Sequence, residues 1–134
     1  MKKYLAVLAI AVLGFTISCT KASPEAEAKA MMSAMTKLTE SSAEKLENAA
    51  SAQDAASALI AYAEGMKAFA EKGKELEKKY PSFDPDNDEK FKAESEEFEK
   101  AMKKFIDAST KASMKYVSSR EFMDAVSKMQ EIMK

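Results

Sequence analysis

The side chain with the most distinctive chemistry in this sequence is a single thiol, at Cys19. The chain contains no histidine and no second cysteine. Cys19 therefore has no disulfide partner within the chain, and the imidazole that serves most acid–base and metal sites is missing. A thiol can still form a stable thioether, so Cys19 is the candidate for covalent modification.

The residues before Cys19 form a short apolar segment behind a positive start. Lys2 and Lys3 follow Met1, and residues 4–17 carry no charge and are almost all apolar. A membrane-spanning helix needs about 20 apolar residues, whereas the apolar part of a secretory signal peptide has about 7 to 15. The pattern predicts a signal peptide over residues 1–18.

The end of this segment resembles the lipobox of bacterial lipoproteins, in which a small residue precedes an obligatory cysteine. Ser18 occupies the small position, while Thr16 stands where leucine is usual. Relaxed lipoboxes of this kind are familiar among small helical lipoproteins of spirochaetes. The resemblance covers only these first residues, and it implies that Cys19 becomes the first mature residue and carries a diacylglyceryl group and an N-linked acyl chain such as palmitate. The alternative is ordinary cleavage near Ser18, which leaves a free N-terminal cysteine.

The lipid would decide where the protein resides. Several acyl chains on Cys19 give lasting membrane attachment, because one chain binds only marginally. Thr20 stands where many lipoproteins retained at the inner membrane carry aspartate. By that analogy we expect a lipid-anchored envelope protein of the outer membrane, with its periplasmic or surface orientation left open.

After a tether at residues 19–23, the rest of the chain is expected to be helical. Alanine, lysine, glutamate and methionine are abundant, and apolar residues recur at spacings of three and four. Serine caps are expected at Ser23, at Ser51 with Asp54, and at Ser118 with Glu121. The sequence predicts an all-α domain over residues 24–134, an antiparallel bundle of three long helices plus a short C-terminal helix, with coiled-coil-like apolar faces. The helices are expected at 24–50, 52–80, 86–117 and 119–133, and the first two are joined by either a bend or a full turn.

Two groups of residues have side chains that could bind a metal ion. Asp84, Asp86 and Asp88 alternate as at the start of a calcium loop, but the later glycine and glutamate of that loop are missing, and helix capping explains them better. Met31 and Met35 share a helix face suited to copper(I), yet methionine is more often a flexible core residue. The sequence predicts no metal and no cofactor.

The net charge and the types of polar residue argue against two classes of function, nucleic-acid binding and catalysis. The formal net charge is −1, which gives no electrostatic reason for nucleic-acid binding. The acids, lysines and hydroxyls form no recognisable catalytic constellation, so the protein is not expected to be an enzyme. Gly65 and Gly73, inside the second helix, allow either a close helix crossing or a cavity for a hydrophobic ligand.

Two functions remain. The first is a non-catalytic binding module at the cell surface or in the periplasm, contacting a protein or an envelope polymer, with Phe83 and Phe122 as candidate contacts. The second is a structural envelope component that self-associates or contacts peptidoglycan. Lys134 is the residue behind this second function, because it resembles the C-terminal lysine of the major peptidoglycan-linked lipoprotein of enteric bacteria. An exposed Phe83 favours the binding module, and a protruding Phe122 favours self-association.

Overall fold

The computed structural model describes residues 23–83 and 89–134, and every regular element within these ranges is a helix. The prediction of an all-α domain is confirmed. The elements are α1 (Pro24–Glu47), α2 (Ala52–Lys79), the short 3₁₀ helix η1 (Glu89–Phe91), α3 (Lys92–Tyr116) and α4 (Arg120–Ile132).

The first two helices begin where the sequence predicts. Ser23 Oγ accepts a hydrogen bond from the Ala26 amide at 3.2 Å, and Pro24 occupies the first helical position. At α2 the Asp54 amide donates to Ser51 Oγ, and the Ser51 amide donates to Asp54 Oδ2, both at 3.1 Å. This reciprocal capping box satisfies two amides that the helix itself leaves without partners.

The last two helices begin later than predicted. The third helix was expected from residue 86, but η1 precedes α3, which starts at Lys92. Asp86, its expected cap, lies outside the described residues. At α4 the expected cap Ser118 is wrong, because Ser119 Oγ accepts from the Phe122 amide at 3.3 Å. Ser119 has the extended backbone that a cap requires, and its amide bonds to the Tyr116 carbonyl at 2.9 Å.

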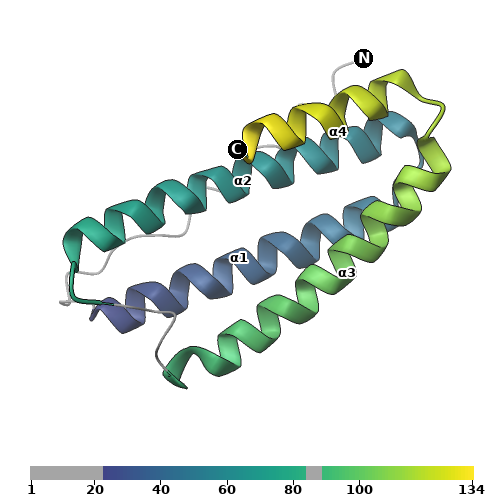
Figure 1. Ribbon diagram of the computed structural model, residues 1–134. Coiled ribbons are helices and arrows are strands. Elements are labelled where there is room, and N and C mark those ends of the chain that lie inside the picture. Colours follow the sequence, from purple (N-terminus) through teal and green to yellow (C-terminus); the bar gives the residue numbers. More distant parts are fainter. Residues whose placement is uncertain (1–22, 84–88) are drawn as a thin grey trace, which may run out of the picture.

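A full turn joins the first two helices. Residues 48–51 are not helical, and the chain reverses direction there, as Figure 1 shows. The side-chain amide of Asn48 donates to the Glu44 carbonyl at 2.9 Å and closes the end of α1. Of the two expected connections, a bend and a full turn, the structure has the turn.

The helices pack in a defined set of pairs. α1 packs against both α2 and α3, and α4 packs along the first half of α2 (Figure 1). α4 has 13 residues and α2 has 28, so the second half of α2 has no α4 beside it. We call the end with residues 48–51 and 117–119 the core end, and the end with Ser23, Tyr80 and Glu89 the tether end.

Three large buried rings lie toward the core end, while a fourth, Phe91, is buried at the tether end. Tyr62 of α2 stacks on Phe105 of α3, with ring centroids 4.0 Å apart. Phe122 of α4 is fully buried and packs against Tyr116, with centroids 5.8 Å apart. Burying one large apolar side chain contributes about 1.5–3 kcal/mol. These rings therefore join α2, α3 and α4 into one core.

A backbone carbonyl connects the two turns of the core end. The Ala49 carbonyl accepts a hydrogen bond from the Tyr116 hydroxyl at 2.9 Å and another from Lys115 Nζ at 3.3 Å. Ala49 is itself buried, and a buried carbonyl without a partner would be costly. The end of α3 thus satisfies a group that the end of α1 leaves open.

The buried face of α1 includes polar residues that hydrophobic spacing does not predict. Met31 and Met35, predicted as core residues, are only partly buried, while Thr36 and Thr39 are buried. Thr36 Oγ1 donates to the Met32 carbonyl at 3.0 Å, and Thr39 Oγ1 donates to the Met35 carbonyl at 2.8 Å. A hydroxyl satisfied by its own helix can be buried at little cost, which hydrophobic spacing alone does not reveal.

The two α2 glycines have different surroundings. A Cβ atom at Gly65 would lie 2.5 Å from Leu38 Cδ2, whereas one at Gly73 would meet nothing within 4 Å. Gly65 therefore allows the close crossing of α1 and α2 that was one of its two expected roles. Gly73 has no such packing reason.

Candidate functional site

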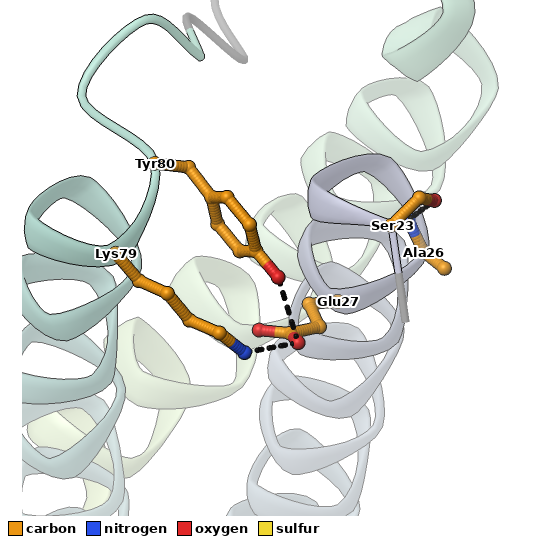
Figure 2. Close-up of polar contacts among 5 residues, drawn as sticks. All are labelled: Ser23, Ala26, Glu27, Lys79 and Tyr80. Atoms are coloured by element: carbon orange, nitrogen blue, oxygen red, sulfur yellow. Dashed lines mark hydrogen bonds and ion pairs between the residues drawn. The ribbon is translucent and has the colours of Figure 1, made fainter. Parts of the chain in front are cut away.

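The tether end carries a cluster of charged side chains around the first turn of α1. Glu27 Oε1 accepts hydrogen bonds from Lys79 Nζ at 2.6 Å and from the Tyr80 hydroxyl at 3.2 Å. Figure 2 shows both donors converging on this one oxygen, beside the Ser23 cap. The end of α2 is thus fastened to the start of α1.

Two more ion pairs fasten α1 to η1 and to the start of α3. Lys90 Nζ lies 2.7 Å from Glu25 Oε1, and Lys29 Nζ lies 3.1 Å from Glu94 Oε1. Exposed pairs of this kind contribute little to stability, because solvent and salt screen their charges. Their common effect is positional, because together they hold the first two turns of α1 between α2 and α3.

The pKa shifts at this end follow from the same pairs. The hydrogen bond from Lys79 holds the pKa of Glu27 below its usual value, and the hydrogen bond from Glu27 raises the pKa of Lys79. The pKa of Glu94 is lowered by a backbone hydrogen bond and by Lys29. Each shift favours the charged form, so these groups are stabilised as ions and are not set up to exchange protons with a substrate.

Cys19 lies outside the described residues, four positions before Ser23. Its lipidation stays a prediction. Within the described part of the chain, no helix is long and apolar enough to cross a membrane.

The two aromatic residues singled out as candidate contacts are in different environments. Phe83 is partly exposed and packs edge-on against Phe91, with ring centroids 5.7 Å apart. Phe122 has 0% of its surface exposed. Phe83 can present one face to a partner, but Phe122 belongs to the core, and we leave it out of any proposed contact surface.

The candidate metal-ligating side chains form no metal site within the described residues. No group of three or more acidic, histidine or cysteine side chains there is arranged to hold a metal ion. The aspartates at 84, 86 and 88 lie outside the described ranges. Met31 and Met35 are partly buried on α1 among helix contacts.

A shallow open groove of about 440 Å³ lies between α2 and α4. Its apolar lining includes Ile60, Ala61 and Ala125, while its charged lining is Glu64, Glu121, Asp124 and Lys128. The exposed surface of this groove is mostly apolar, with the four charged side chains distributed among the apolar ones. Neither Gly65 nor Gly73 lines this groove, so it does not provide the glycine-lined cavity considered for a hydrophobic ligand.

The sequence reasoning missed an exposed apolar surface on α3. Ile106 is 53% exposed and Val117 is 62% exposed, and Thr110 and Ser113 between them are also exposed. Ile106, Thr110 and Ser113 lie on one face of α3, and Val117 follows as its C-cap with the same spacing; we call these four residues the outer seam of α3. The sequence signal is an uncharged stripe on a helix whose other exposed positions are largely charged.

Comparisons of the chain with protein-family models, with curated proteins and with solved structures find no match in any of the three sets.

Proposed function

We propose that this chain is a bacterial envelope lipoprotein and a non-catalytic interaction module. In this proposal residues 1–18 are removed, Cys19 carries the lipid, and residues 24–134 form an antiparallel bundle of three long helices and a short fourth. The observation that carries it is the lone thiol at Cys19, placed directly after Ser18 and an uncharged apolar segment. We favour the outer membrane, facing either the periplasm or the outside.

The position of the first helix supports a short tether. Four peptide units separate Cys19 from Ser23, and a fully extended chain of that length spans at most about 14 Å. The capped start of α1 would then remain close to the membrane surface. The ion pairs of the tether end would fix α2 and α3 around that point.

The polar residues support an interaction role over catalysis. The acids with shifted pKa values, Glu27 and Glu94, are paired with Lys79 and Lys29 on the bundle surface. None of these four residues lines the groove between α2 and α4. Contact with a partner requires only exposed surface, which Phe83 and the outer seam supply.

The decisive experiment is metabolic labelling with palmitate in the native host. The wild-type protein should take up label and fractionate with membranes, whereas Cys19→Ser should do neither, because a hydroxyl cannot form the thioether. Ser23→Ala is the matched control, since it changes a nearby serine and leaves Cys19 intact. An unlabelled wild-type protein would refute the lipid anchor, and label retained by Cys19→Ser would refute the assignment to this residue.

The side of the membrane is decided by protease treatment of intact cells. Loss of the labelled protein, with a periplasmic marker left intact, places the module outside and directs the search toward extracellular partners. Protection until the outer membrane is permeabilised places it in the periplasm, where cell-wall and assembly partners are the candidates.

A structural, self-associating envelope component is the second candidate function. One observation favours it: the outer seam of α3 is exposed, uncharged and spaced for contact with another helix. The aromatic residue first considered for this role, Phe122, is buried and does not contribute.

A further inference from the structure

The last two turns of α2 lack the packing that holds the first half of the helix. Six residues of α2 between Ala55 and Ala63 are buried, whereas none is buried from residue 64 to Tyr80. Residues 74–80, which we call the strap, are exposed except for Leu76 and Tyr80, and these two are only partly buried. A segment opens locally at low cost where few apolar contacts are lost, so the strap is the part of α2 that separates most easily.

Gly73 directly precedes the strap and has no packing role. A Cβ atom at this position would meet nothing within 4 Å, so the surroundings do not require a glycine. Inside a helix, glycine has more conformational freedom to lose than alanine, and it lowers the stability of the helix around it. The backbone of α2 is therefore easiest to bend or unwind at the residue where the strap begins.

A polar contact at the far end of the strap holds it against α1. Lys79 Nζ and the Tyr80 hydroxyl both donate to Glu27 Oε1, at 2.6 and 3.2 Å (Figure 2). The side chains of Glu27 and Lys79 are 29% and 57% exposed, so water and salt ions reach the pair. The contact fixes the position of the strap without making its closure strongly favourable.

Met31 lies on the face of α1 that the strap covers. Glu27, four positions before it, is bonded to Lys79 of α2. Leu38, seven positions after it, lies directly beside Gly65 of the same helix. Spacings of four and seven place all three α1 residues on one helix face, and Met31 is partly buried there. Separation of the strap from α1 would therefore uncover this methionine.

We propose that residues 74–80 open and close on α1 as a strap, with Gly73 as its hinge and Glu27 as its latch. Rising ionic strength screens the latch and favours the open state, which exposes the apolar surface around Met31 at the tether end. The inference depends on the packing of the bundle and is independent of the proposed lipid anchor. It gives the module a salt-sensitive change in the surface that it presents.

Hydrogen exchange followed by mass spectrometry tests the strap on the mature protein isolated from its native host. Amides of the strap should exchange faster than those of residues 64–72 and much faster than those of residues 55–63. Urea at concentrations that leave the bundle folded should change the strap rates little, because local opening exposes little surface. Raising NaCl from about 0.05 M to about 1 M should speed exchange in the strap about twofold to fivefold and should affect residues 55–63 less.

Three variants separate the latch from the hinge. Glu27→Ala removes the latch, so strap exchange should rise about twofold to fivefold and lose most of its salt response. Glu40→Ala is the matched control, because it is exposed on the same helix more than three turns away and should change neither quantity. Gly73→Ala should slow strap exchange about fivefold, the factor that corresponds to its gain in helix propensity.

Oxidation of methionine by hydrogen peroxide shows whether α1 is uncovered. Sulfoxide formation at Met31, measured by mass spectrometry, should rise with salt and in Glu27→Ala as strap exchange does. Met114 on α3 is 75% exposed already and should react at the same rate throughout.

Four results would overturn the proposal. Strap exchange as slow as that of residues 55–63 excludes local opening. Equal rates in the strap and in residues 64–72, or no slowing in Gly73→Ala, exclude the hinge. Equal strap exchange in Glu27→Ala and Glu40→Ala excludes the latch. Constant oxidation of Met31 while strap exchange responds to salt means that the strap unwinds without leaving α1. Circular dichroism and the exchange of residues 55–63 verify that each variant is folded.

Discussion

Replacing each α2 glycine by alanine tests the closest contact in the bundle. Both glycines are interior to the same helix, so each substitution gains about 1 kcal/mol of helix propensity. At Gly73 nothing lies within 4 Å of the new methyl group, and the full gain should appear. At Gly65 the methyl would lie 2.5 Å from Leu38 Cδ2, so Leu38 must move out of its packed position. Overpacking of this kind costs about 1–3 kcal/mol, which cancels or reverses the gain.

Urea and thermal unfolding, followed by circular dichroism on the chain from residue 20 onward, measure both effects. Gly73→Ala should raise the free energy of unfolding by about 1 kcal/mol, equivalent to about 4 °C in Tm for a domain of this size. Gly65→Ala should be neutral or destabilising. Because helix propensity is common to both variants, their difference isolates the crossing of α1 and α2.

A double-mutant cycle identifies the contact. With Leu38→Ala already present, the obstruction is gone, and Gly65→Ala should recover the gain seen at Gly73. The coupling energy between the two positions is expected to be about 1–2 kcal/mol. The reasoning is refuted if Gly65→Ala stabilises the wild-type background as much as Gly73→Ala does, or if the cycle shows no coupling.

Three further predictions concern the core, a helix cap and pH. Tyr62→Phe keeps the stack on Phe105 and loses the hydrogen bonds of the hydroxyl, one to Met102 Sδ at 3.2 Å and one with Thr39, so it should cost about 1 kcal/mol. Tyr62→Ala should cost about 3–5 kcal/mol, and urea titrations compare the two variants. Ser51→Ala should cost about 1 kcal/mol by the same assay, and Ser51→Asn, which can still cap, should restore most of it. The pKa of Glu27 is lowered, so its contribution is present above the usual value of 4.5 and is lost as pH falls through the folded value. The pKa values of Lys79 and of Tyr62, the latter buried, are raised, so their contributions are present below 10.5 and 10.0 and are lost as pH rises through the folded values. With no histidine in the chain, the urea midpoint should be nearly flat from about pH 6 to 9 and should fall on both sides, and in Lys79→Ala the acid-side fall should be shallower.

Features determined by local sequence were predicted well. Ser23 with Pro24, and Ser51 with Asp54, specify helix starts through bonds spanning three residues, so no knowledge of the fold was needed. The Ser118 cap was wrong by one residue, because serines at 118 and 119 offer the same chemistry and the end of α3 decides between them.

Features determined by packing were predicted less well. Thr39 is fully buried on α1 while Met35 is only partly buried, and the decisive fact is a hydroxyl bonded to its own helix. Phe122 could be identified as apolar from the sequence, but its burial depends on where α4 lies against α2. The outer seam was missed for a related reason, since an exposed apolar face is recognised only after the covered one is known.

Because α4 is short, the two halves of α2 differ in local stability. Beside the first half of α2, four helices share the rings of Tyr62, Phe105 and Phe122, whereas toward Lys79 the side chains Met66, Phe69 and Leu76 are only partly covered. Amide protons in that second half should exchange with solvent through local opening that leaves the rings undisturbed. If Cys19 is the anchor, the second half of α2, which opens locally, lies nearest the lipid. The end of the bundle that holds the three rings then lies farther from the membrane and stays folded.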